Sequence, residues 1–257
     1  QAKSGTKTLI ERYIQEIDDA LRLLAELPDE VIPIQQKLDF FYRSNVCYGR
    51  SALMLSGGGV LGFLHLGVVT ELLRHDLLPR VISGSSAGSI VAAALGCYND
   101  DELQRLDFIA LLESAGNDTS GLIRGWLTGA GVRFTAETTE QLIAATIPDL
   151  TFAEAYAKTG RQVSITVAPS EPHQRSRLLN AVSSPNVYLR SAVMASCAIP
   201  GVFPPVMLKA KNEKGEPQPY LPARRWVDGS VADDLPAKRL SRLFSTNHYI
   251  VSMVNPI

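Results

Sequence analysis

Residues 79–98, PRVISGSSAGSIVAAALGCY, hold a short apolar run, a turn of glycine and serine, and then a run of small apolar residues. The first run predicts a buried strand over residues 80–83, and the last predicts a helix over residues 87–98. A strand that enters a helix through a tight glycine-rich turn is typical of α/β proteins with a mostly parallel sheet.

The same order occurs on both sides of this stretch. An apolar run at residues 52–55 leads through a glycine-rich loop to an expected helix that carries Leu64, Val68 and Leu72. Beyond it we expect helices over residues 103–114, 137–147 and 152–158, strands over residues 162–168 and 248–254, and a loop or hairpin over residues 208–223. The pattern predicts a mostly parallel central sheet with helices on both faces.

The N-terminal part has a different pattern of apolar and charged residues. Apolar residues recur at helical spacing over residues 9–24, and a second helix is expected over residues 33–49. We therefore predict a helical segment over residues 1–50 and one domain over residues 51–257. The charges between the apolar positions are mixed in sign, which favours packing on the following domain over a role at a membrane surface. The chain begins at Gln1, and we expect the helical segment to be the tail of a longer preceding region.

Composition excludes several classes of protein. Of 257 residues, 46% are hydrophobic and 20% are charged, values unlike those of collagen-like, coiled-coil or disordered chains. A net charge of −1 disfavours a general nucleic-acid binder, which usually needs a basic surplus. Three cysteines cannot form a disulfide framework and fit a reducing compartment. No apolar run approaches the roughly 18 residues of a membrane span, and no Cys/His cluster has the spacing of metal ligands.

The turn at residues 84–88 is the first candidate for chemistry. It matches Gly-x-Ser-x-Gly, with a strand before it and a helix after it, the context in which this motif presents a nucleophilic serine. Ser86 would then adopt a strained backbone conformation, and Gly84 and Gly88 would remove side chains that clash there. The alternative is a serine that caps the following helix. The strand–turn–helix setting favours the nucleophile.

The glycine-rich loop at residues 57–62, GGGVLG, is the second candidate. Unpaired N–H groups in such a loop can hold an oxyanion during acyl transfer or the pyrophosphate of a dinucleotide. A dinucleotide site expects an acidic residue where the second strand ends, but residues 83–86 read SGSS. The sequence therefore favours an oxyanion hole formed by Gly57, Gly58 and Gly59.

A nucleophilic serine also needs a group that accepts its proton. Asp228 stands in residues 226–230, WVDGS, where a short strand is expected to end at a turn containing Gly229. Asp-Gly is also a common plain turn. Of the four histidines only His248 follows both Ser86 and Asp228, which is the chain order of an α/β-hydrolase triad. His248 opens a strand-like run, however, and this favours a structural histidine.

These three motifs, in this order and spacing, resemble the patatin-like phospholipase family. The similarity narrows to the triacylglycerol-lipase branch of fungi and plants, with bacterial relatives, in which an extra helical segment of unassigned function precedes the core. The residues that carry it lie at 5–14, 77–90, 195–201 and 247–256. It covers most of the chain and is weaker over residues 107–149 and 208–223.

The resemblance implies a three-layer patatin-like sandwich and a lipid acyl-ester hydrolase of the triacylglycerol lipase or phospholipase A type. Ser86 and Asp228 would work as a dyad through an acyl-enzyme, with no histidine, cofactor or metal. It implies a lipid substrate, no nucleic-acid partner, and a position inside the cell at the surface of a membrane or lipid droplet. A homo-oligomer stays open.

Three other functions stay open beside this one. The same site could transfer the acyl group to a lysophospholipid or a diacylglycerol. A triad of Ser86, Asp228 and His248 would make an ordinary α/β-hydrolase esterase, and a lipid binder could keep the fold without catalysis. Two positions depart from the pattern of many patatins: Leu61 replaces Arg or Lys in the glycine loop, and Ser230 replaces a second glycine after Asp228.

Some apolar residues could contact an acyl chain. Six could line a groove, although at least half of them are expected in the core: Leu55, Phe63, Leu64, Val202, Phe203 and Met207. A second apolar cluster could be a lid, a bilayer contact or plain core: Leu122, Ile123, Trp126 and Leu127.

Overall fold

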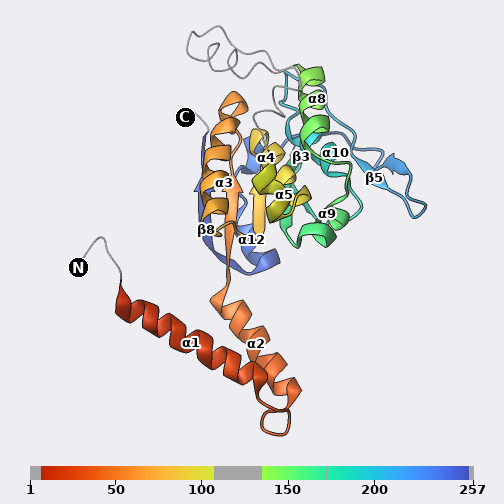
Figure 1. The fold of residues 1–257 in the computed structure, drawn as a ribbon. Coiled ribbons are helices and arrows are strands. Elements are labelled where there is room, and N and C mark those ends of the chain that lie inside the picture. The colour runs from red at the N-terminus through yellow and green to blue at the C-terminus, as the bar shows by residue number, and fades with distance from the viewer. Residues whose placement is uncertain (1–6, 107–134, 172, 255–257) are drawn as a thin grey trace. The chain divides into compact units, whose positions relative to one another are not determined.

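The computed structural model describes residues 7–106, 135–171 and 173–254. The chain divides into two compact units, Gln1–Gly49 and Arg50–Ile257. Figure 1 shows both units.

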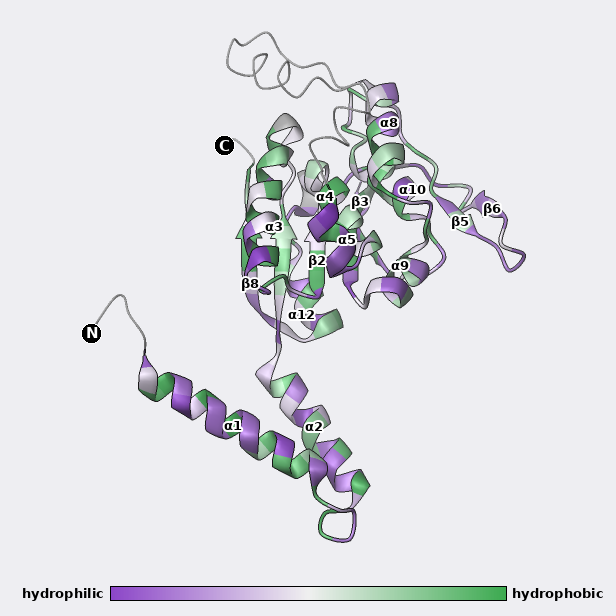
Figure 2. Cartoon of the chain, viewed as in Figure 1, coloured by the Kyte–Doolittle hydropathy of each residue, from purple (hydrophilic) through white to green (hydrophobic). Residues whose placement is uncertain are grey.

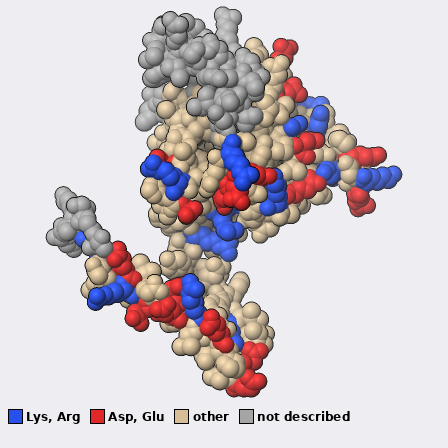
Figure 3. All heavy atoms as spheres, viewed as in Figure 1, with Lys and Arg blue, Asp and Glu red and all other residues tan. Residues whose placement is uncertain are grey.

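The first unit holds two helices, α1 (Thr8–Glu26) and α2 (Ile34–Tyr48). Both expected helices are confirmed, and α2 ends where Gly49 adopts a positive φ of 79°. No side chain of α1 is buried within this part of the structure. Figure 2 shows hydrophobic and hydrophilic residues alternating along α1, and Figure 3 shows charges of both signs on the same helix.

The second unit is built on a six-stranded sheet. Its strands are β1 (Arg50–Leu55), β2 (Val81–Gly84), β3 (Gln162–Pro169), β4 (Arg177–Asn180), β7 (Trp226–Asp228) and β8 (Thr246–Ser252). They lie in the order β4-β3-β2-β1-β8, and β7 also pairs with β3. The pairs β1–β2, β1–β8 and β2–β3 are parallel, whereas β4 and β7 run antiparallel to β3. The mostly parallel sheet is thus confirmed.

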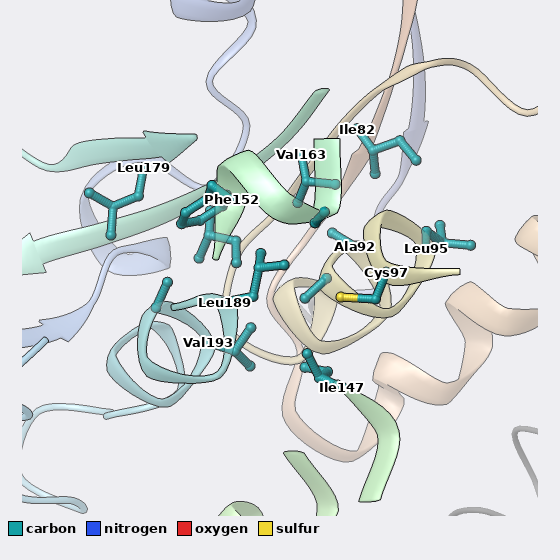
Figure 4. Packing of buried hydrophobic residues seen from close by; sticks show 14 of the residues in the cluster. Ile82, Ala92, Leu95, Cys97, Ile147, Phe152, Val163, Leu179, Leu189 and Val193 are labelled. Atoms are coloured by element: carbon teal, nitrogen blue, oxygen red, sulfur yellow. The ribbon is translucent and has the colours of Figure 1, made fainter. Parts of the chain in front are cut away.

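Helices cover both faces of this sheet. They are α3 (Leu64–Arg74), α4 (Ala87–Cys97), α5 (Asp100–Arg105), α8 (Ala136–Thr146), α9 (Phe152–Thr159), α10 (Leu189–Ser196), α11 (Ser230–Asp233) and α12 (Ala237–Phe244), with a 3₁₀ turn η1 (Gly59–Phe63) before α3. Because side chains alternate along a strand, Leu53 faces the core beneath α4 and α10, whereas Met54 faces Leu240 and Phe244 of α12. Figure 4 shows the first of these cores, with Val163 of β3 between Phe152 and Ala92. The three-layer α/β architecture is confirmed.

Several expectations change in detail. The helix expected over residues 103–114 is α5, which ends at Arg105, and residues 107–114 lie outside the described ones. The apolar cluster of Leu122, Ile123, Trp126 and Leu127 also lies outside them. The expected loop or hairpin contains β5 (Lys209–Lys211) and β6 (Pro217–Pro219), which pair antiparallel. Among the helices that the structure describes, none is long and apolar enough to span a bilayer.

Candidate active site

Ser86 occupies the turn between β2 and α4 in a strained conformation. Its backbone has φ 48° and ψ −124°, although it carries a side chain. A Cβ on Gly84 would lie 2.3 Å from the carbonyl oxygen of Gly88, and a Cβ on Gly88 would lie 2.4 Å from that of Leu55. Both glycines are therefore required by the close approach of β1, β2 and α4. This is the geometry that the Gly-x-Ser-x-Gly motif predicts.

Other serines hold this turn in place. The Ser86 N–H donates to Ser196 Oγ at 2.9 Å, and Ser196 Oγ donates to the carbonyl oxygen of Thr166 at 2.8 Å. Ser89 Oγ donates to the carbonyl oxygen of Ser86 at 2.6 Å. Within the described residues the Ser86 side chain makes no capping hydrogen bond to α4, so the helix-cap interpretation of this serine is wrong.

Asp228 reaches Ser86 because β2 and β7 follow one another along the same edge of β3. Val167 pairs with Arg177 of β4 on one side, so its pairing with Asp228 lies on the side of β2. β2 occupies that side only as far as Ile165 of β3. There Gly84, the last residue of β2, pairs with Ile165, and the chain then turns into α4. β7 starts beyond this point and runs back toward it, which leaves Asp228, its last residue, next to the serine turn.

The Asp228 carboxyl is buried, with 3% of the residue exposed. Burial raises its pKa above the usual range, while hydrogen bonds from the Ser230 N–H, the Ser86 hydroxyl and the Ser230 hydroxyl oppose that shift. The Ser230 N–H lies 2.8 Å from Asp228 Oδ1. A Cβ on Gly229 would lie 2.7 Å from the backbone of Thr166, so this turn needs glycine. The structure thus places Ser86 and Asp228 next to each other.

His248 lies at the other end of the sheet. Its Nδ1 is 2.9 Å from Ser51 Oγ, and Ser51 pairs with His248 near the start of parallel strands β1 and β8. Ser86 follows the carboxyl end of β2, where Gly84 pairs with Leu55. The four-residue advance from Ser51 to Leu55 covers about 13 Å. A triad of Ser86, Asp228 and His248 is therefore wrong, because a histidine at the amino end of β8 cannot reach the serine.

The glycine loop lies against the serine turn, but its first amide is engaged. A Cβ on Gly57 would lie 3.3 Å from Ser86 Cβ. The Gly57 N–H donates to Asp234 Oδ1 at 2.8 Å, which removes Gly57 from the three expected oxyanion donors. The amides of Gly58 and Gly59 have no acceptor within the described part of the chain. These two amides stay available to an incoming oxygen.

Sequence patterns missed three residues that support the site: His65, Ser196 and Asp234. His65 is fully buried, with Nε2 2.9 Å from the carbonyl oxygen of Ser56 and Nδ1 2.7 Å from Ser252 Oγ. Burial lowers its pKa, so the neutral ring donates from Nε2 and accepts at Nδ1. The contacts of His65 with Ser252, of Ser196 with Ser86 and of Asp234 with Gly57 join segments far apart in the chain. No local spacing in the sequence signals such a contact.

The arrangement suits acyl transfer. A serine hydroxyl next to a buried carboxyl, beside amides that have no acceptor among the described residues, provides a nucleophile, a base and oxyanion donors. Cys197 is the neighbouring alternative nucleophile, with Sγ 3.5 Å from the carbonyl oxygen of Ser86. Burial, together with the nearby Asp228 charge, raises the pKa of its thiol to about 12. The thiolate form is thus disfavoured at neutral pH.

Residues 53–240 match the sequence model of the patatin-like phospholipase family. The chain belongs to this family. It is 40% identical over 267 residues to triacylglycerol lipase SDP1L of Arabidopsis thaliana, which covers 96% of this chain and 33% of the relative. It is 38% identical over 261 residues to a patatin-like phospholipase domain-containing protein of Aspergillus clavatus, which covers 100% of this chain and 36% of the relative.

This patatin-like chain therefore spans about a third of the length of the curated relatives it matches, 33% and 36% for these two. Both alignments include the N-terminal helices as well as the sheet domain. Among solved structures, the crystal structure of VipD from Legionella pneumophila aligns with 79% of this chain and 49% of that chain, with a TM-score of 0.45 and 16% identity.

Proposed function

We propose that this patatin-like domain hydrolyses acyl esters of lipids through a dyad of Ser86 and Asp228. The observation that carries the proposal is the position of the buried Asp228 carboxyl beside Ser86, close enough for the serine hydroxyl to lower its pKa. The amides of Gly58 and Gly59, which have no acceptor in the described part of the chain, belong to the loop that lies against the same serine turn. Membership of the patatin-like phospholipase family supports the reaction class. The likeness to a triacylglycerol lipase supports a glycerolipid substrate.

The first half of the reaction makes an acyl-enzyme. Ser86 Oγ bonds to the ester carbonyl carbon while its proton passes to Asp228, and the carbonyl π electrons move onto oxygen. The amides of Gly58 and Gly59 donate to this oxyanion, and losing one such donor typically costs about 3–4 kcal/mol of transition-state stabilisation. The intermediate then collapses, the ester C–O bond breaks, and the leaving alcohol takes the proton from Asp228.

The second half repeats these steps with water. Water adds to the acyl carbon as Asp228 accepts its proton, and collapse releases the fatty acid and returns a proton to Ser86 Oγ. The pKa of Asp228, raised by burial, suits this role because a base is most effective when its pKa approaches the working pH. A lysophospholipid or diacylglycerol hydroxyl in place of water would make the same site a transacylase.

Exposed apolar side chains near the site support a lipid substrate. Leu64 is 61% exposed just after the glycine loop, and Val202 is 64% exposed four residues after Ala198, whose carbonyl oxygen accepts the Asp228 N–H at 2.9 Å. Of the expected groove residues, Leu55 is instead fully buried core. We propose that the exposed pair meets the acyl chains at the surface of a membrane or lipid droplet.

The test is hydrolysis of emulsified triacylglycerol and of phospholipid vesicles by wild type, Ser86→Ala and Asp228→Asn. The proposal predicts fatty-acid release from at least one lipid by wild type, and release at background level by both variants. Cys197→Ser serves as the control and should keep most of the activity. Equal release by wild type and Ser86→Ala would refute the proposal.

A further inference from the structure

Asp234 connects the glycine loop to the serine turn. Its Oδ1 accepts the Gly57 N–H at 2.8 Å, and its backbone oxygen accepts the Ser85 hydroxyl at 3.0 Å. Ser85 is fully buried and precedes Ser86. The segment that begins with Asp228 therefore contacts, six residues later, a second component of the same site, the glycine loop.

The peptide group between Ser56 and Gly57 is held at both of its polar ends. His65 Nε2 donates to the Ser56 carbonyl oxygen at 2.9 Å, and the Gly57 N–H on the same peptide plane donates to Asp234. A peptide group is planar, so these two bonds fix its rotation. The next two residues are glycines, whose backbones are otherwise free to turn.

We propose that Asp234 is a positioning residue: by fixing the Ser56–Gly57 peptide it directs the amides of Gly58 and Gly59 toward the carbonyl that Ser86 attacks. This inference rests on the proposed function. Asp234 itself touches no reacting atom. What the loop needs from it is a hydrogen-bond acceptor in a fixed place, and an asparagine oxygen supplies the same acceptor without the charge.

The direct test is hydrogen exchange at the Gly57 amide, which needs no activity. Wild type is compared with Asp234→Ala, with the rescue variant Asp234→Asn, and with the control Asp233→Asn. Asp233 is the neighbouring acid, and it pairs with Arg239 at 3.3 Å instead of with the loop. We expect the amide to exchange at least tenfold faster in Asp234→Ala and at the wild-type rate in the other two. Equal exchange in wild type and Asp234→Ala would overturn the proposal.

The kinetic arm uses a soluble ester and its thionoester analogue. For Asp234→Ala we expect kcat to fall by about 10²-fold, as for loss of an oxyanion donor, with KM nearly unchanged and with a weaker preference for the oxygen ester. Asp234→Asn should recover most of kcat. An Asp234→Ala enzyme with wild-type kcat, or an Asp234→Asn enzyme as slow as Asp234→Ala, would overturn the proposal.

The two arms separate this inference from the proposed function. If wild type hydrolyses no ester, the proposed function fails, and the exchange rates alone decide whether Asp234 holds the loop. If wild type is active and the Asp234 variants behave like wild type in both arms, the positioning role fails while the dyad stands. Should Asp234→Ala not fold, Asp234→Asn is compared with Asp234→Leu, which has a similar volume and no acceptor.

Discussion

Asp228 lies beside Ser86, close enough for the serine hydroxyl to lower the pKa of its carboxyl, although one residue ends β7 and the other turns from β2 into α4. Both strands pair with the same edge of β3, and this shared edge brings the two side chains together. The stability and pH behaviour of the domain should therefore depend on the same carboxyl as its activity.

Replacing Asp228 with Asn should lower activity and raise stability. Loss of a general base typically costs about 10²–10⁴-fold in rate. Burial raises the folded-state pKa of Asp228 above its ordinary value of 3.8, so the folded protein holds this proton more tightly than the unfolded chain. Wild type therefore loses stability as the pH rises from the unfolded-state pKa of Asp228 through its higher folded-state pKa. The neutral variant has no such loss.

Thermal unfolding checks this. Asp228→Asn should have a higher melting temperature than wild type at pH 8. This difference should disappear at a pH below 3.8, where residue 228 is neutral in both proteins. A variant that melts below wild type at pH 8 would contradict the burial cost.

Ser230 should set the acid limb of the pH profile. Activity should rise with pH as Asp228 loses its proton. The Ser230 hydroxyl donates one of the hydrogen bonds that lower the pKa of this carboxyl. Ser230→Ala keeps the backbone N–H but removes the hydroxyl, so the limb of kcat/KM against pH should move to higher pH. An unchanged or acid-shifted limb would show that this hydroxyl does not act on Asp228.

His248 should be dispensable for catalysis. Its ring bonds to Ser51 near the start of β1 and β8, far from the serine turn. His248→Ala should keep kcat/KM within about twofold of wild type, since it touches no part of the site and surface changes of this kind seldom cost much. If a folded His248→Ala variant were as inactive as Ser86→Ala, the triad of Ser86, Asp228 and His248 would be supported after all.

Gly88 should tolerate no side chain. Gly88→Ala places a methyl 2.4 Å from the carbonyl oxygen of Leu55, and overpacking of this kind typically costs about 1–3 kcal/mol. Gly67→Ala is the matched control, because it lies in α3 with nothing within 4 Å of its added methyl. This change should stabilise by roughly 0.5–1 kcal/mol. Urea unfolding compares the two, and a Gly88→Ala protein as stable as wild type would contradict the close approach.

The parts of the site with a local pattern could be predicted from the sequence. The serine turn follows from adjacent glycines between a strand and a helix, and Asp228 follows from an Asp-Gly at a strand end. The chain order of His248 is compatible with a triad, but order carries no information about which end of a strand a residue occupies. The strand pairing that places it at the far end appears only in the folded sheet.

The supporting contacts could not be predicted. Asp234 and Gly57 lie far apart in the chain, and an acid in a charged stretch next to Asp233 reads as an ordinary surface residue. α10 and α12 are only eight residues long and, unlike the equally short α9, they begin without a side-chain cap. Neither hydrophobic spacing nor a capping signal therefore marks them in the sequence. β4 has four residues with a charged first position, and its pairing with β3 is a long-range contact.

The central claim is that Ser86 is a nucleophile activated by Asp228. The most direct measurement is intact mass after exposure to a long-chain alkyl fluorophosphonate, with and without liposomes, for wild type and Ser86→Ala. We expect one adduct on wild type, located at Ser86, and none on the variant. No adduct on folded wild type under either condition, or an adduct that persists in Ser86→Ala, would contradict it.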